Sequence, residues 1–270
     1  MRTAAILPVK RFGRAKARLA PGLPDRLRGE LARAMVSDVL VALAACESLE
    51  HTIVVSGERS LPREALGGAS VLEDEDELGQ SAAVAAGIER ALAEGINRVL
   101  CIPGDCPALD AAELDALLAR TADEESEEAE VVIVPDRHGT GTNGLLLSPP
   151  RAIAPSFGPG SCERHIELAR DAGARFRLAR VPSLQLDIDT ASDLEALVAA
   201  LEAPPGSPPA GAGGHARSIG SRAGAGASAI GARARPMGGR AEHTRELLVR
   251  AIGSGVPAGS AASASQAAAR

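Results

Sequence analysis

Apolar positions follow two different spacings along the first 200 residues of the chain. Some short segments are continuously apolar, such as 98–103 (Arg-Val-Leu-Cys-Ile-Pro), which is typical of strands buried on both faces of a sheet. Other segments carry an apolar side chain every three or four residues, which predicts helices. The predicted strands are 4–9, 52–56, 69–72, 98–103, 130–135, 144–147 and 176–181. The predicted helices are 26–46, 81–93, 111–121, 161–172 and 190–201.

Strands that alternate with helices in this way predict an α/β domain. We expect a single Rossmann-like sheet, mixed but mostly parallel, with helices on both faces. Ligands of such sheets bind at the carboxyl ends of the strands, so the loops that follow the strands should carry the chemistry. Two acidic runs, 73–77 and 123–128, fall between the predicted elements and are interpreted as solvated loops.

A change in composition at residue 203 marks the end of the predicted folded domain, 1–202. Residues 203–239 are rich in Gly, Ala, Pro, Ser and Arg, and they cannot bury enough apolar surface to offset their ordering entropy. Residues 240–252 could form one short helix, but an isolated helix of that length is marginal. We therefore expect 203–270 to be a disordered, low-complexity tail. The alternative is a basic arm for an anionic partner, because this segment has eight arginines and two glutamates.

Composition excludes several classes of protein. No apolar run is long enough to span a membrane, and no signal peptide is evident, so we expect a cytoplasmic protein without a membrane partner. The three aromatic residues are all phenylalanine, which disfavours nucleic-acid binding by base stacking. The four cysteines are too scattered for a disulfide scaffold and are interpreted as small buried thiols. They are Cys46, Cys101, Cys106 and Cys162.

Lysine occurs only twice among the 29 basic residues, and both lysines lie in the loop after the first predicted strand. Lys10 and Lys16 share the segment 7–19 with three arginines. A strand-to-helix loop so rich in cations suits a phosphate ligand, although the glycine pattern of a Walker A loop is absent. The alternative interpretation is a solvated basic loop.

Three aspartates follow predicted strands. Asp105 stands between two prolines just after the strand 98–103, where a carboxylate makes a good ligand for a hard cation. Asp187 and Asp189 should share one side of an extended segment, and two such carboxylates repel unless a cation or protons lie between them. The three together predict a Mg²⁺ site. Asp105 could instead be a helix cap or turn residue, and Asp189 could only cap the helix 190–201.

Two further loops offer hydrogen-bond donors. Residues 137–144 (Arg-His-Gly-Thr-Gly-Thr-Asn-Gly) join two predicted strands, and 157–165 open a predicted helix. Free N–H groups at a helix N-terminus bind anions, and Ser161 could cap that helix or donate to an anion. With the basic loop and the aspartates, these loops predict a pocket for two phosphorylated ligands and a metal. A serine hydrolase is disfavoured, since the Gly-x-Ser-x-Gly elbow is absent.

The combined motifs resemble the 2-phospho-L-lactate/phosphoenolpyruvate guanylyltransferases of coenzyme F-420 biosynthesis, over roughly residues 3–200. The motifs are Leu-Pro-Val-Lys with Ala-Lys-Ala-Arg-Leu, Pro-Gly-Asp-Cys-Pro, His-Gly-Thr-Gly-Thr-Asn and Phe-Gly-Pro-Gly-Ser with Arg-His. The resemblance implies a fold like that of nucleotide-diphospho-sugar transferases. It implies three groups of site residues: Lys10 and Lys16 on the nucleotide phosphates; Asp105, Asp187 and Asp189 on Mg²⁺; and Thr142, Gly158 and Ser161 on the phosphorylated acid.

The reaction implied is transfer of GMP from GTP to a phosphorylated three-carbon acid, with release of pyrophosphate. Phosphoenolpyruvate ranks first as acceptor, 2-phospho-L-lactate second and 3-phosphoglycerate third. The chain has Leu-Gly-Gln-Ser at 78–81 where similar enzymes often carry Gly-Leu-Asn, so the contacts to guanine are open. The alternatives are a different acceptor, such as molybdopterin or a sugar phosphate, and a non-catalytic nucleotide-binding protein. A homodimer is possible.

Overall fold

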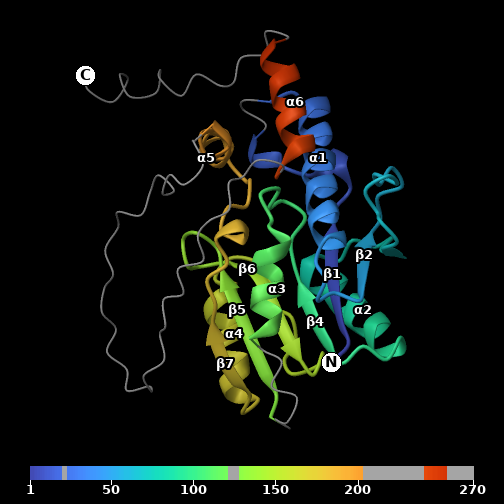
Figure 1. Cartoon of the computed structure of the whole chain (residues 1–270), viewed down its shortest axis with the longest axis vertical. Helices are drawn as coiled ribbons and strands as arrows, with labels where there is room; N and C mark the ends of the chain where they lie inside the picture. The colour runs from blue at the N-terminus through green and yellow to red at the C-terminus, as the bar shows by residue number, and fades with distance from the viewer. Residues whose placement is uncertain (20–22, 121–127, 203–239, 254–270) are drawn as a thin grey trace, which may run out of the picture.

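A seven-stranded sheet forms the centre of the computed structural model, which describes residues 1–19, 23–120, 128–202 and 240–253 (Figure 1). The strand order is β3-β2-β1-β4-β6-β5-β7. The strands are β1 (Thr3–Val9), β2 (His51–Ser56), β3 (Ser70–Glu73), β4 (Arg98–Cys101), β5 (Glu130–Pro135), β6 (Thr142–Ser148) and β7 (Arg175–Leu178). Only β6 runs antiparallel to its neighbours, β4 and β5, among the strands described. The predicted mixed, mostly parallel sheet is confirmed.

Helices cover both faces of this sheet, as the sequence predicts. They are α1 (Asp25–Ala44), α2 (Gln80–Ala93), α3 (Ala111–Ala119), α4 (Ser161–Asp171), α5 (Ala191–Glu202) and α6 (Glu242–Gly253). Alternate residues of a strand point to opposite faces. Thus Ala5 and Leu7 of β1 join the cluster that contains α1 and α3, whereas Ala4 and Ile6 join the cluster that contains α2 and α4.

The carboxyl-end loops contain three short 3-10 helices: η1 (Phe12–Arg14), η2 (Ala17–Leu19) and η3 (Pro182–Leu184). The last predicted strand, 176–181, is shorter in the structure, where β7 ends at Leu178 and the chain turns into η3 at Pro182. Proline has no N–H to donate to a sheet, so it starts the new element instead. All four cysteines are free and buried, which confirms their interpretation as small buried thiols.

The sequence predicts that a helix over 240–252 would be isolated and marginal, but the structure shows a helix packed against the domain. Helix α6 lies alongside α1 (Figure 1), and its Leu247 is buried with residues of α1 and α5 in a third apolar cluster. Packing against α1 supplies the stability that an isolated helix of this length lacks. The rest of the expected tail, 203–239 and 254–270, lies outside the described residues. Within the described ranges no helix has the length and apolar character needed to cross a membrane.

Helix α2 approaches the sheet closely at Gly87. A Cβ atom there would lie 2.5 Å from Cγ2 of Ile6 and 3.2 Å from Cγ2 of Val55, both in central strands. Overpacking costs about 1–3 kcal/mol, and alanine regains about 1 kcal/mol of helix propensity. A contact of 2.5 Å forces the neighbours to shift, which places the cost in the upper half of that range, so we predict that Gly87→Ala lowers the free energy of unfolding in urea by about 1–2 kcal/mol. The control is Gly13→Ala, where a Cβ meets no atom within 4 Å. A G87A protein as stable as wild type would contradict this close approach.

Candidate active site

The basic loop after β1 is held by glutamates of two other loops. The N–H of Arg11 donates to Glu77 Oε1 at 3.0 Å, and the N–H of Phe12 donates to Glu58 Oε2 at 2.8 Å. Arg14 also pairs with Glu77 at 3.2 Å. The interpretation of 73–77 as a solvated loop is therefore wrong for Glu77, whose side chain is only 15% exposed. Its negative charge neutralises part of the cationic loop and fixes the position of that loop.

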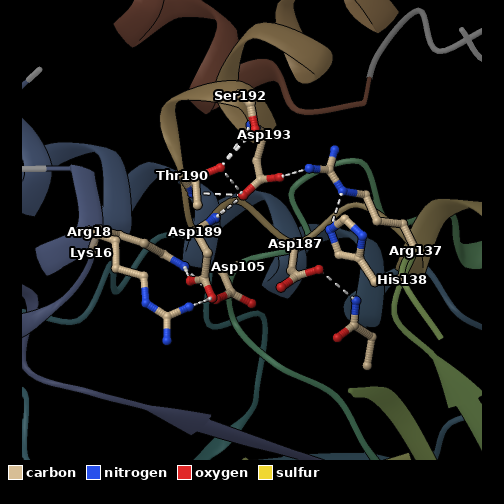
Figure 2. A network of polar contacts seen from close by, with 11 residues as sticks. Lys16, Arg18, Asp105, Arg137, His138, Asp187, Asp189, Thr190, Ser192 and Asp193 are labelled. Atoms are coloured by element: carbon tan, nitrogen blue, oxygen red, sulfur yellow. Dashed lines mark hydrogen bonds and ion pairs between the residues drawn. The ribbon is translucent and has the colours of Figure 1, made fainter. Parts of the chain in front are cut away.

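Lys16 lies between two of the predicted metal ligands (Figure 2). Its ammonium group bonds to Asp105 Oδ2 and, at 3.0 Å, to Asp189 Oδ1, and its side chain is only 8% exposed. Burial disfavours the charged amine, but the two carboxylates outweigh burial and raise the pKa of Lys16 above its ordinary value. The Lys16 backbone has φ 56°, a left-handed conformation that is strained for a residue with a side chain. This residue is thus held in place by both carboxylates.

Asp105 has one carboxylate oxygen without a hydrogen-bond partner in the described part of the chain. Its Oδ1 atom is buried and accepts no hydrogen bond within the described ranges. Asp105 is not a helix cap, because α3 is capped by Asp110, whose carboxylate accepts the N–H of Ala112 at 2.8 Å. A buried carboxylate oxygen without a partner is costly and suits a hard cation. The donor chemistry at Asp105 therefore fits Mg²⁺.

Asp187 differs from the other two aspartates. Figure 2 shows its carboxylate turned toward an amide, and Oδ1 accepts the Nδ2–H of Asn143 at 3.0 Å. Burial and the negative charges of Asp105 and Asp189 raise the pKa of Asp187, although the bond from Asn143 opposes the shift. In the described part of the chain, no three acidic, His or Cys side chains meet as a ready metal cage. The structure thus brings Asp105 and Asp189 together on Lys16 and leaves Asp187 beside them.

The segment that carries Asp189 is fixed by the start of α5 (Figure 2). The carboxylate of Asp193 accepts the N–H groups of Asp189 at 3.0 Å and Thr190 at 2.7 Å, and it pairs with Arg137 of the β5–β6 loop. Thr190 and Asp193 therefore form a capping arrangement at the start of α5. Because Asp193 and Thr190 make these bonds, Asp189 is free for Lys16 and is not merely a helix cap.

A cavity of about 520 Å³ opens beside Lys16, within the size range of small-molecule sites. Its wall carries four cationic side chains, two site aspartates and part of the 78–81 segment: Lys10, Arg14, Lys16, Arg18, Asp105, Asp189, Gly79 and Gln80. Lys10, the other predicted phosphate ligand, is exposed there. The cavity lies where β1 and β4 end, as predicted for the carboxyl edge of the sheet.

Thr142, Gly158 and Ser161 form a second group around the start of α4. Among the described residues, none of the three lines the cavity beside Lys16. Gly158 and Gly160 have φ 113° and 71°, which favour glycine, and they bend the chain into the helix. Ser161 is the first helical residue, not the cap, and its N–H is already bonded to Gly158 O at 3.0 Å. The expectation of a Ser161 cap is therefore wrong, and the residue is buried at the start of the helix, with 1% of its surface exposed.

Arg164 and Ser81 hold this second group in place, and sequence reasoning assigned neither a role. The Arg164 guanidinium donates to the carbonyl oxygens of Ser156 at 3.0 Å and Phe157 at 3.3 Å. The N–H of Phe157 donates to Ser81 Oγ at 2.8 Å, which joins the loop to the helix that borders the cavity. Arg164 stands inside a motif that the sequence singled out, so its position in that motif was the available signal.

His165 fixes the direction in which the Thr142 hydroxyl donates. The N–H of Ser156 donates to Nε2 of His165 at 2.9 Å, so a neutral ring carries its proton on Nδ1. Nδ1 lies 3.0 Å from Thr142 Oγ1 and donates to it. The Thr142 oxygen is thereby used as an acceptor, and its own proton points elsewhere. Burial, together with the charge of Arg164, lowers the pKa of His165 to about 4 and keeps the ring neutral.

Comparison with known proteins gives consistent results. Residues 3–202 match the family model described as "Guanylyl transferase CofC like". The chain is 50% identical to phosphoenolpyruvate guanylyltransferase of Conexibacter woesei, over 73% of this chain and 87% of that protein. It is 35% identical to 2-phospho-L-lactate guanylyltransferase of Methanothermobacter thermautotrophicus, over 73% and 85% of the two chains. A solved structure from Desulfovibrio desulfuricans, described as a nucleotide-diphospho-sugar transferase, has a TM-score of 0.55 at 18% identity, covering 73% of this chain and 87% of that chain. That likeness shows a shared fold.

The neutral, buried His165 predicts a pH dependence of stability. The unfolded chain binds a proton near pH 6.5, whereas the folded protein does so only near pH 4. The free energy of unfolding should therefore fall as pH drops from about 6.5 to about 4, by up to about 1.4 kcal/mol per pH unit, and this contribution is constant above that window. Urea titrations across the window should show this slope in wild type and lose it in His165→Asn. His138→Asn, the same change at an exposed position, should keep it. If the free energy of unfolding has the same slope against pH in wild type and in H165N, His165 is not the group responsible.

Proposed function

Because this chain belongs to the CofC-like guanylyl transferase family, we propose that it transfers GMP from GTP to phosphoenolpyruvate for coenzyme F-420 biosynthesis. The products are pyrophosphate and enolpyruvoyl-2-diphospho-5'-guanosine. The observation that carries the proposal is the convergence of Lys16, Asp105 and Asp189 at the wall of a cation-lined cavity. Phosphoenolpyruvate ranks first because the relative at 50% identity bears that name, and 2-phospho-L-lactate ranks second because a relative at 35% identity bears that one.

In the proposed reaction, a phosphate oxygen of the acid attacks the α-phosphorus of GTP. The bond from that phosphorus to the bridging oxygen breaks, and pyrophosphate leaves with the electron pair. A phosphate monoester is already ionised at neutral pH, so no strong general base is required. Catalysis then consists of positioning the two phosphates and neutralising their charge. Lys10 and Lys16 supply positive charge on the nucleotide side, and Arg14 and Arg18 line the same cavity.

The proposed Mg²⁺ would be held by Asp105 through Oδ1, which accepts no hydrogen bond from the described residues, with Asp189 and Asp187 beside it. When bound, the ion neutralises charge on the phosphoryl oxygens in the transition state. The ammonium group of Lys16 binds both the Asp105 and the Asp189 carboxylate and so keeps them close together. A triphosphate in the cavity would offer the ammonium group new partners, since phosphate oxygens bind it as carboxylate oxygens do.

The acceptor acid is proposed to bind at the second group of residues. The hydroxyl groups of Thr142 and Ser161 can donate to its phosphate or carboxylate, and the backbone at Gly158 permits close approach. Because the His165 ring donates to Thr142 Oγ1, the hydroxyl proton of Thr142 points away from that ring. We place guanine at the end of the cavity bordered by Gly79 and Gln80, where the sequence departs from the family pattern. A cytoplasmic location belongs to the proposal, and a homodimer stays a prediction.

A substrate panel tests the proposed reaction. The full chain is incubated with GTP, Mg²⁺ and each of three acids: phosphoenolpyruvate, 2-phospho-L-lactate and 3-phosphoglycerate. We expect the mass of the phosphoenolpyruvate adduct of GMP and an equal amount of pyrophosphate, and loss of both when EDTA is added. Parallel incubations replace the acid with molybdopterin or a sugar phosphate, and product in these alone would replace the proposed acceptor. Nucleotide binding without any product would favour the non-catalytic alternative.

Asp105→Asn tests the role of the Asp105 carboxylate. The amide keeps the size of the side chain but removes its charge, so we expect the rate of pyrophosphate release to fall by at least about a hundredfold. The fold should survive, as judged by circular dichroism. Asp171→Asn, the same change at an exposed position at the end of α4, should retain wild-type turnover. Turnover by D105N near the wild-type rate would remove Asp105 from the mechanism.

A further inference from the structure

Helix α6 lies outside the family match, which ends at residue 202, but it is anchored by a buried carboxylate. Asp38 of α1, only 6% exposed, accepts four hydrogen bonds from the start of α6. The donors are the N–H of His243 at 2.9 Å, the N–H of Thr244 at 2.9 Å, the Thr244 hydroxyl at 2.6 Å and His243 Nδ1 at 2.9 Å. A carboxylate is favourable at a helix N-terminus, where N–H groups lack partners within the helix. The start of α6 is therefore fixed on α1.

A second anchor joins α6 to the loop of Asp105. Arg240 pairs with Asp110, and both side chains are largely buried. Asp110 is also the N-cap of α3, so the same carboxylate orders the chain that follows Asp105. The two anchors hold α6 against two different elements of the sheet's α1/α3 face.

The third contact is apolar, and it lies in a cluster with members from all three segments that carry the nucleotide-side residues. Leu247 of α6 is 6% exposed and belongs to one buried cluster with Leu19, Ala108 and Ile188. Leu19 follows Lys16 by three residues, Ala108 follows Asp105 by three, and Ile188 immediately precedes Asp189. The N–H of Ile188 also donates to the carbonyl oxygen of Asp105 at 3.1 Å. One buried cluster therefore includes residues from the three chain segments that carry Lys16, Asp105 and Asp189.

We propose that α6 is a positioning element of the nucleotide site. It holds the segments of Lys16, Asp105 and Asp189 at fixed mutual distances through Leu247, Asp38 and Asp110. Such support is needed because Asp105 and Asp189 repel each other and the Lys16 backbone is strained. This inference rests on the proposed function for its kinetic test. Release of α6 should weaken the binding of GTP and leave the binding of the acid unchanged.

The selectivity follows from the location of α6, which packs on α1, whereas the acceptor residues pack on α4. The apolar cluster that contains Leu247 includes residues of α1, α5 and the nucleotide-side loops. Thr142 bonds to His165 of α4, and the neighbouring Cys162 and Ile166 belong to the cluster on the opposite face. A disturbance of α6 therefore acts on the nucleotide side first.

The test is Leu247→Asp in the full chain, with Val249→Asp as the matched control. Val249 lies on the same helix two residues further on and is 63% exposed, so the same charge is added without loss of packing. Initial rates of pyrophosphate release are measured against GTP and against phosphoenolpyruvate. We expect the KM for GTP to rise about tenfold in L247D, the KM for the acid to stay within about twofold, and V249D to match wild type. An L247D enzyme with wild-type constants, or with a lower kcat and both KM values unchanged, would overturn the proposal.

If L247D does not fold, milder variants at Thr244 test the same role of α6. Thr244→Val removes one hydrogen bond to Asp38 and keeps the branched shape, so the same selective rise in the KM for GTP is expected at smaller size. Thr244→Ser keeps the hydroxyl and should restore the wild-type value. If T244V, T244S and wild type have the same KM for GTP, the hydrogen bonds to Asp38 do not position the nucleotide site.

A second readout separates this inference from the proposed function. Wild-type chain that turns over none of the acids refutes the proposed reaction, but amide hydrogen exchange still measures the coupling. In L247D, or in T244V where L247D does not fold, the N–H of Leu19 and the N–H of Ile188 should exchange faster than in V249D. These groups are bonded to the carbonyl oxygens of Lys16 and Asp105, respectively. Amides of β6 should exchange equally in the proteins compared. Unchanged exchange at Leu19 and Ile188 would overturn the positioning role.

Discussion

The ion cluster of Lys16 with Asp105 and Asp189 is the interaction on which the organisation of this site depends. Two carboxylates that lie so close would repel each other, and a single lysine would lose its hydration on burial. Together the three groups satisfy one another, and the cluster ties a loop near residue 16 to chain segments about 90 and 170 positions away. The cluster therefore decides how the carboxyl ends of β1 and β4 and the segment before α5 meet. A polyanionic ligand suits the same place because it can take over the bonds of the ammonium group.

The topology of the sheet explains why the acceptor group lies beside this cluster. The antiparallel β6 starts at the edge where the parallel strands β4 and β5 end. Its first residues, Thr142 and Asn143, therefore reach the carboxyl edge and point to opposite faces, as successive strand residues do. Asn143 bonds to Asp187 on the nucleotide side, whereas Thr142 bonds to His165 of α4. One reversed strand thus supplies a side chain to each half of the site.

The strands, the helices and the residue types of the site are predictable from the sequence, because they depend on local periodicity and on the residues directly after each strand. Lys16, Asp105 and Asp189 stand out as a rare lysine and two carboxylates that follow strands, and they do meet.

The residues that position this site are harder to predict from the sequence. Glu77 belongs to an acidic run that resembles a solvated loop, since its pairing with the loop of Arg11 spans 66 residues and leaves no local pattern. Ser161 has the residue type of a helix cap, but the chain enters α4 through two glycines and needs no side-chain cap. Helix α6 is marginal by its own length, whereas its stability comes from contacts with Asp38 and through Leu247.

The two halves of the site rest largely on different helices, and this constrains how the proposed reaction is brought about. In-line attack requires the acid's phosphate and the α-phosphate of GTP to be held within a few tenths of an ångström of a productive geometry. The segments of Lys16, Asp105 and Asp189 rest on α1, α5 and α6, the cavity is also bordered by α2, and the acceptor side rests on α4. Contacts that join the two sides include the bond from the Phe157 N–H to Ser81 Oγ, the bond from Asn143 to Asp187, and the pair of Arg137 with Asp193. Each half can therefore be rigid by itself while these crossing contacts set the distance between the reacting phosphates.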